Sequence, residues 1–120
     1  MSRKVKVSDV RQGATLFYVR AWPHKGLASS VEEIIVTKRP VMNSTGLFGE
    51  YKSFFSDDLG CGWFARPFSL KDAGIIPNPY NFHNTFSSRK AAERYAARMN
   101  RKCLTAAERI KFERKLSNDS

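Results

Sequence analysis

The first half of the chain carries short apolar runs separated by turn residues, which is typical of β-strands rather than helices. Five segments have this character: residues 5–7, 14–22, 31–38, 51–56 and 61–68. Residues 43–46 (NSTG) and 57–60 (DDLG) have the composition of tight turns. Because only short connections separate the runs, we expect an antiparallel sheet of four or five strands, open or curled into a small half-barrel.

The strand pattern stops at residue 69. Residues 69–86 are punctuated by glycine, proline and asparagine, which predicts a long loop wrapping the β body. Tyr80, Phe82 and His83 are its candidate contact residues.

Residues 87–102 (SSRKAAERYAARMNRK) form the clearest helical pattern in the chain. At about 100° per residue, one side of the helix collects small and apolar side chains, and we expect it to pack on the sheet. The other side is cationic, with Lys90, Arg94, Arg98 and Arg101 in one quadrant and Lys102 just beyond. Ser87 or Ser88 is the expected N-cap.

A second helix is predicted from Ala106 towards Leu116, because Thr105 and Glu108 have the spacing of a capping box. The expected fold class is therefore α+β, with two C-terminal helices after the sheet. We expect a single domain over residues 1–120, with a β body (1–68), the wrapping loop (69–86) and a basic helical end (87–117).

The net positive charge of the chain adds the expectation of a negatively charged binding partner. The 120 residues contain 21 lysines and arginines against 11 acidic residues, a net charge of +10. Residues 1–86 carry a net +4 and residues 87–120 a net +6, so the helical end holds most of the excess. Arginine and lysine suit phosphate. The cationic row, with Lys102, is expected to contact a DNA or RNA backbone or, alternatively, an acidic host or phage protein. Duplex or single strand, and oligomeric state, stay open.

A second basic and aromatic cluster lies on the predicted strands, at Phe54, Phe55, Trp63, Phe64, Arg66 and Phe68. Such residues can stack unpaired bases. Strand aromatics are more often buried, so the sequence favours a core role for them.

No enzymatic signature is present, and we expect no catalytic residue, metal or cofactor. The two histidines, His24 and His83, lie in predicted loops, and a small nuclease using either is the weakest alternative. Cys61 and Cys103 have no partner at metal-ligand spacing, which favours free thiols in a reducing cytosol. No run reaches membrane-span length, so the expected location is cytoplasmic.

The segment TFSSRKAAERYAARM, residues 85–99, leads from a Phe-Ser-Ser sequence into an Ala/Arg-rich helix after a compact β body. In this the chain resembles small basic accessory proteins of tailed bacteriophages. That group has no common activity, so the resemblance assigns no functional residue. It implies a protein that binds and modulates a host or phage machine, inhibiting or adapting a larger enzyme complex in the host cytoplasm.

Overall fold

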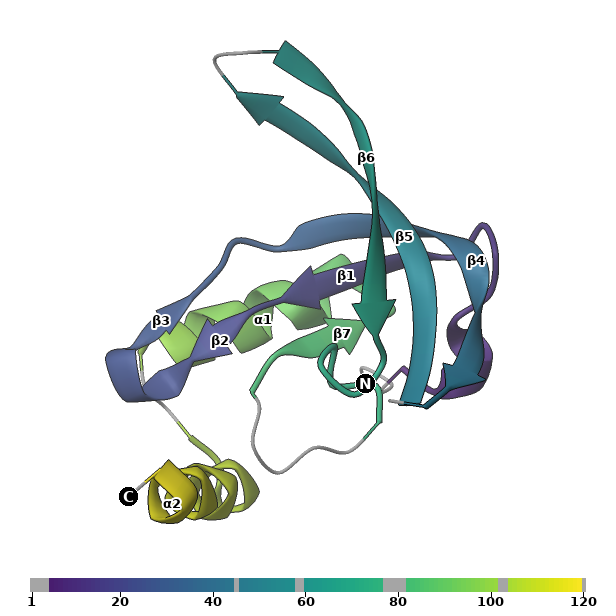
Figure 1. The fold of residues 1–120 in the computed structure, drawn as a ribbon. Helices are drawn as coiled ribbons and strands as arrows, with labels where there is room; N and C mark the ends of the chain where they lie inside the picture. The colour runs from purple at the N-terminus through teal and green to yellow at the C-terminus, as the bar shows by residue number, and fades with distance from the viewer. Residues whose placement is uncertain (1–4, 45, 58–59, 77–81, 102–103, 120) are drawn as a thin grey trace.

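The computed structural model describes residues 5–44, 46–57, 60–76, 82–101 and 104–119. These residues form a five-stranded antiparallel half-barrel followed by two C-terminal helices, α1 (Arg89–Asn100) and α2 (Ala106–Asp119) (Figure 1). The sheet has the order β6-β5-β4-β1-β7. Its strands are β1 (Thr15–Val19), β4 (Glu32–Asn43), β5 (Gly46–Asp57), β6 (Gly60–Ser69) and β7 (Asn84–Phe86). The predicted α+β class and strand number are confirmed.

The fifth strand is not the predicted one. Val5–Val7 was expected to form a strand, but the chain here leads into a 3-10 turn, η1 (Val7–Asp9), capped by the Asp9 carboxylate, which accepts from the Lys6 N–H at 2.8 Å. The missing strand is β7, which lies within the segment expected to be a loop. It pairs with the outer edge of β1, where Phe17 faces Phe86.

Three predicted strand limits also differ. The strand expected over residues 51–56 is β5, which already begins at Gly46. Residues 14–22 divide at Arg20 into β1 and the short β2 (Ala21–Trp22), which pairs with β3 (Leu27–Ala28) beyond a 3-10 turn, η2 (Pro23–Lys25). β4 was expected to end at Arg39–Pro40, but it continues to Asn43 through two register shifts that flank Lys38. Such bulges allow a proline, which has no N–H to donate, inside a paired strand.

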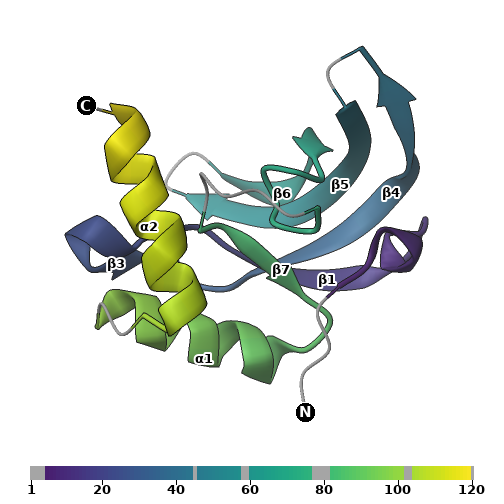
Figure 2. The same cartoon turned by 90° about the horizontal axis from the view of Figure 1, so that it is seen from below.

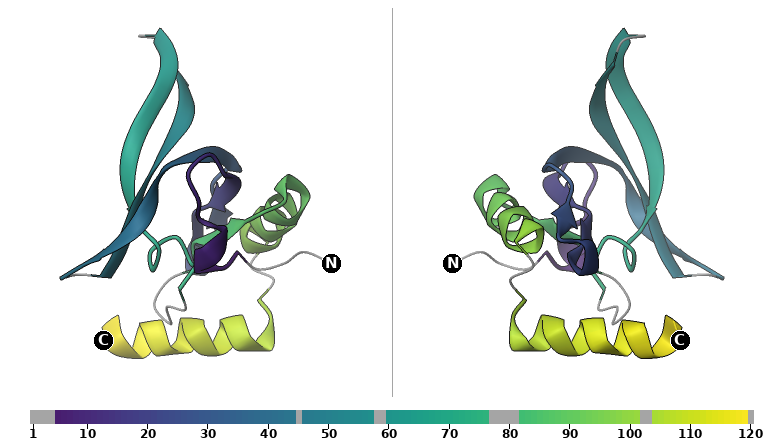
Figure 3. Two further views of the ribbon diagram at one scale, coloured as in Figure 1. Left: turned by 90° about the vertical axis from the view of Figure 1, so that its right-hand side faces the viewer. Right: turned by 90° about the vertical axis from the view of Figure 1, so that its left-hand side faces the viewer.

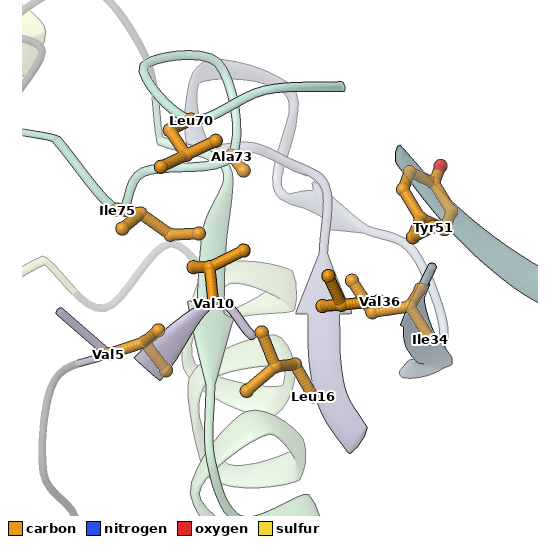
Figure 4. Packing of buried hydrophobic residues seen from close by; sticks show 9 residues of the cluster. All are labelled: Val5, Val10, Leu16, Ile34, Val36, Tyr51, Leu70, Ala73 and Ile75. Atoms are coloured by element: carbon orange, nitrogen blue, oxygen red, sulfur yellow. The ribbon is translucent and has the colours of Figure 1, made fainter. Parts of the chain in front are cut away.

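The concave face of the half-barrel carries one hydrophobic core. Four strand residues point to this face: Leu16, Ile34, Val36 and Tyr51. Leu16 is paired with Ile34 and Val36 with Tyr51, and Ile34 and Val36 are two residues apart on β4, so all four lie on the same side of the sheet. Figure 4 shows that the N-terminal segment and the turn after β6 fill the space in front of them. The filling side chains are Val5, Val10, Leu70, Ala73 and Ile75.

The convex face is covered over β1 and β7 by α1. Ala92, Tyr95, Ala96 and Met99 of the helix pack against Val19, and Ala92 and Met99 are fully buried. The predicted N-cap is Ser88, whose hydroxyl accepts from the Ala91 N–H. At the other end Asn100 accepts from the Ala28 N–H at 2.7 Å, which ties the helix to β3. The predicted docking of this helix is confirmed.

The second helix also begins as predicted. Thr105 and Glu108 exchange the two hydrogen bonds of a capping box, at 2.9 and 3.2 Å. Phe112 packs against the cluster under α1, and Figure 2 shows α2 running steeply across the direction of α1.

The long β5–β6 hairpin, called the arm below, projects away from the rest of the chain (Figure 1). Figure 3 shows β1 between the arm and α1. The arm forms one end of the strand order, and the basic helix covers the strands β1 and β7 at the other end.

The turn that connects β6 to the concave core depends on a glycine, and this gives a stability prediction. Gly74 has φ of +76°, and a Cβ added there would collide with the His83 carbonyl oxygen, whereas Gly13, at φ +88°, has nothing within 4 Å of such a Cβ. Gly13→Ala should cost about 1–2 kcal/mol for the left-handed backbone alone. Gly74→Ala should cost about 1–3 kcal/mol more, because the turn must also move. Urea unfolding of both variants measures the difference, and equal losses would contradict the close packing of this turn.

Candidate nucleic-acid interface

The outer face of α1 carries the predicted cationic row. Lys90 and Arg94 are exposed at the middle of that face, and Arg101, also exposed, caps the C-terminal end through its backbone N–H. Lys102 lies outside the described residues. Since the opposite side of the helix is buried, the side chains of Lys90 and Arg94 point away from the protein body.

Arg98 has a different environment from the rest of the row. Its Nη2 lies 3.1 Å from Glu108 Oε2, and its guanidinium carbon lies 5.2 Å from the centre of the Tyr95 ring. Its side chain is 35% exposed and its Nε is buried without a hydrogen-bond partner. Arg98 thus connects α1 to α2, and the carboxylate already offsets its charge.

The predicted loop contacts turn inward. Phe82 is 3% exposed, and its carbonyl oxygen accepts a hydrogen bond from the buried Tyr95 hydroxyl. Burial raises the pKa of Tyr95 above its usual range, so the phenol stays protonated and keeps donating. His83 Nδ1 accepts from the Ala21 N–H at 2.9 Å, which attaches the segment to β2. Tyr80 lies outside the described residues.

The arm displays aromatic side chains that were expected to be buried. Phe54, Trp63 and Phe64 are 58%, 53% and 56% exposed. Phe54 and Trp63 are paired across the hairpin and their rings meet edge to face at 5.8 Å, while Phe64 belongs to the opposite face. The core prediction was wrong for these three residues because this part of the arm extends past the elements that cover the rest of the sheet (Figure 1).

Each exposed face of the arm has a cation over an aromatic ring. Lys52 Nζ lies 5.3 Å from the Trp63 ring centre, and the Arg66 guanidinium carbon lies 5.3 Å from that of Phe64. These contacts are typical of partly exposed cation–π pairs.

The structure also contains a cavity that was not predicted from the sequence. A cavity of about 370 Å³ lies between the concave face and the turn after β6, and Tyr18, Arg20, Tyr51, Arg66 and Asp72 are among its lining residues. They come from distant parts of the sequence and meet only through the strand register, so no local motif marks them.

Two classes of site find no support in the described part of the chain. No group of three or more His, Cys, Asp or Glu side chains is placed to hold a metal ion there. No helix among those residues is long and apolar enough to cross a membrane. Cys61 is an exposed free thiol, and Cys103 lies outside the described residues.

Fold and surface together define a small basic α+β protein, a half-barrel with a docked cationic helix and a projecting aromatic arm. Residues 4–99 match the family described as Phage g100-like protein, so the chain belongs to that family and is a phage protein. Neither the curated proteins nor the solved structures include a significant match. The expected phage origin is thereby confirmed, while the family description states no activity.

The Arg98–Glu108 pair predicts that loss of the Glu108 carboxylate destabilises the protein more than loss of an exposed carboxylate on the same helix. Glu108→Gln keeps a side chain able to complete the capping box but leaves Arg98 without its carboxylate. We expect it to lower the free energy of unfolding by about 1–2 kcal/mol. Glu113→Gln changes the net charge equally at an exposed position of the same helix and should stay within about 0.5 kcal/mol. Chemical denaturation compares the two, and equal stabilities would show that the ion pair contributes nothing.

Proposed function

We propose that this phage protein is a non-enzymatic nucleic-acid-binding accessory protein that contacts phosphates through the outer face of α1. The observation that carries the proposal is the two-sided character of the helix. Its inner side chains, from Ala92 to Met99, are buried in the sheet-facing core, while Lys90 and Arg94 are exposed on the outside. A cationic row on a docked helix suits a phosphate backbone, because the helix is already ordered before binding.

The charge around α1 supports the same assignment. The chain from residue 87 onward carries 10 basic and 4 acidic side chains. Arg109 and Arg114, which are exposed on α2, extend the basic character beyond α1. A surface of this sign attracts polyanions at low ionic strength and loses them as salt rises.

Two existing ion pairs reduce the number of cations that are candidates for phosphate contact. Arg98 is paired with Glu108, and Arg89 donates to Glu33 at 3.0 Å. We therefore assign the contacts first to Lys90 and Arg94, with Arg101 and Lys102 as the adjoining residues of the predicted row.

Charge reversal on the row tests this function. Lys90→Glu with Arg94→Glu should abolish retention of a labelled random duplex at about 50 mM salt, because both assigned phosphate contacts become repulsive. For the unmodified protein, log Kd against log salt should have a slope magnitude of about 2–4, as two to four released counterions imply. Fluorescence anisotropy between about 50 and 200 mM salt measures both quantities.

A matched control keeps the net charge the same. Lys25→Glu with Arg39→Glu reverses two exposed cations outside α1 and should retain most of the affinity. If both double variants lose binding equally, the attraction is a property of net charge and not of α1. If the unmodified protein binds neither a random duplex nor a random single strand at 50 mM salt, the proposed function is wrong.

The arm favours a second candidate function, a protein-interaction module that inhibits or adapts a larger host or phage enzyme complex. Residues 46–69 contain two basic and three acidic side chains, so the arm has no net positive charge to attract a nucleic-acid backbone along its length. Exposed aromatics such as Phe54 and Trp63 are instead the side chains that dominate protein interfaces. The residue 69–86 loop is a weaker candidate for this contact, since Leu70, Ala73 and Phe82 are buried.

Removal of the aromatic pair tests the second function. Phe54→Ala with Trp63→Ala should eliminate a protein captured from nuclease-treated host lysate, because the centre of the interface is lost. Val41→Ala with Met42→Ala removes exposed apolar side chains from the end of β4 and serves as the matched control. Quantitative mass spectrometry of the captured proteins provides the readout. A capture profile unchanged by the arm variant would contradict this function.

A further inference from the structure

The cavity on the concave face has a polar end built from two arginines and two tyrosines. Tyr18 lies in β1 and Arg20 directly follows that strand. Tyr51 lies in β5 and Arg66 in β6. Arg66 forms a side-chain hydrogen bond with Tyr51, and Arg20 lies over the Tyr18 ring with its guanidinium carbon 5.2 Å from the ring centre. These contacts join the four side chains in two pairs, and all four line the same cavity.

Hydrogen-bond donors outnumber acceptors at this end. Arg20 Nη1 lies 3.4 Å from Glu32 Oε2, and Arg66 is hydrogen-bonded to Tyr51. Each guanidinium group has more N–H donors than this one contact uses. Burial raises the pKa of Tyr18 to about 12 and that of Tyr51 above its usual value, so both phenols remain O–H donors at neutral pH. Asp72 is the one carboxylate that lines the cavity, and it is exposed.

The remainder of the cavity wall is mainly apolar, and Phe48 and Phe68 are its aromatic residues. Phe68 meets Tyr51 edge to face, with ring centres 5.2 Å apart and planes at 78°. Figure 4 shows the phenol oxygen of Tyr51 directed away from Ile34 and Val36, so the polar end of this ring faces away from the aliphatic core. A ligand in this space meets ring faces and edges on one side and donors on the other.

We propose that this cavity binds one nucleotide, with its phosphate at Arg20 and Arg66 and its planar base against the aromatic wall. A phosphate offers several acceptor oxygens to two guanidinium groups and two phenols, whereas a carboxylate offers two. The planar base suits the wall formed by Tyr51 and Phe68. The volume of about 370 Å³ is in the range of small-molecule sites.

The nucleotide has two chemical sources, a free mononucleotide or an unpaired unit of a strand. The site does not depend on the α1 row, because it lies on the concave face whereas α1 packs on the convex one. It adds a ligand class to the chain without requiring the function proposed above.

Isothermal titration with uridine and adenosine 5′-monophosphates tests the site, with the parent nucleosides and inorganic phosphate as separate probes. At least one mononucleotide should bind more tightly than either of its two parts. Arg66→Gln should weaken it by about tenfold or more, as loss of one charge-assisted contact implies. Lys52→Gln removes the same charge from the opposite face of the arm and should leave the affinity unchanged.

Three outcomes would overturn the proposal: no mononucleotide binding, equal binding of phosphate alone, or equal effects of Arg66→Gln and Lys52→Gln. A Tyr51→Phe variant that folds normally supplies a second check, since it should weaken mononucleotide binding by removing one donor. Competition between the mononucleotide and short duplexes shows whether the bound nucleotide is free or part of a strand. If a short duplex with an unpaired 5′-phosphorylated overhang displaces the mononucleotide and a blunt duplex does not, the strand is the source; if neither displaces it, the source is the free nucleotide.

The test also separates this site from the α1 interface. The Lys90→Glu, Arg94→Glu variant should keep mononucleotide binding, and Arg66→Gln should keep the salt-dependent binding of blunt duplex. Loss of both activities in either variant would contradict the independence of the two sites.

Discussion

The packing of one side of α1 on β1 and β7 is the contact on which the surface chemistry depends. Ala92 and Met99 are fully buried, and the Tyr95 hydroxyl donates to the Phe82 carbonyl oxygen across the same cluster. A buried hydrogen bond of this kind is costly to leave unmade, so it fixes the rotation of the helix about its own axis. That rotation places Lys90 and Arg94 outward and directs Arg98 towards α2. The cationic row is therefore a consequence of core packing as much as of sequence.

The half-barrel separates three surfaces of different chemistry. The helix side is cationic, the arm carries uncovered aromatic rings, and the concave face encloses a donor-rich cavity. The last two arise from incomplete coverage of one sheet: α1 covers the convex face only over the strands near β1, and the turn after β6 fills only part of the concave face. Accessory proteins that connect a nucleic acid to a larger assembly need separate surfaces of this kind, and the arrangement fits the functions proposed for this phage protein.

The features that could be predicted from the sequence are those whose causes are local. The cap at Ser88, the capping box at Thr105 and the buried side of α1 each follow from residues within one or two helical turns. The β4–β5 and β5–β6 hairpins follow in the same way from turn residues between strand-like runs. The fifth strand could not be found, because β7 has three residues and exists through its pairing with β1. The Arg98–Glu108 pair and the cavity depend on how distant elements are placed, and exposure of Trp63 depends on the length of the arm beyond its cover.

The central claim, that the outward cations of α1 contact phosphates, is tested most directly by arginine side-chain NMR. Nε–Hε resonances of a labelled sample can be followed while a random duplex is added at low salt. The account predicts that Arg94 shifts in a salt-dependent manner, while Arg98, held between Glu108 and the Tyr95 ring, stays in place. An unchanged Arg94 resonance in the presence of bound duplex, with shifts confined to the Trp63 indole of the arm, would contradict it.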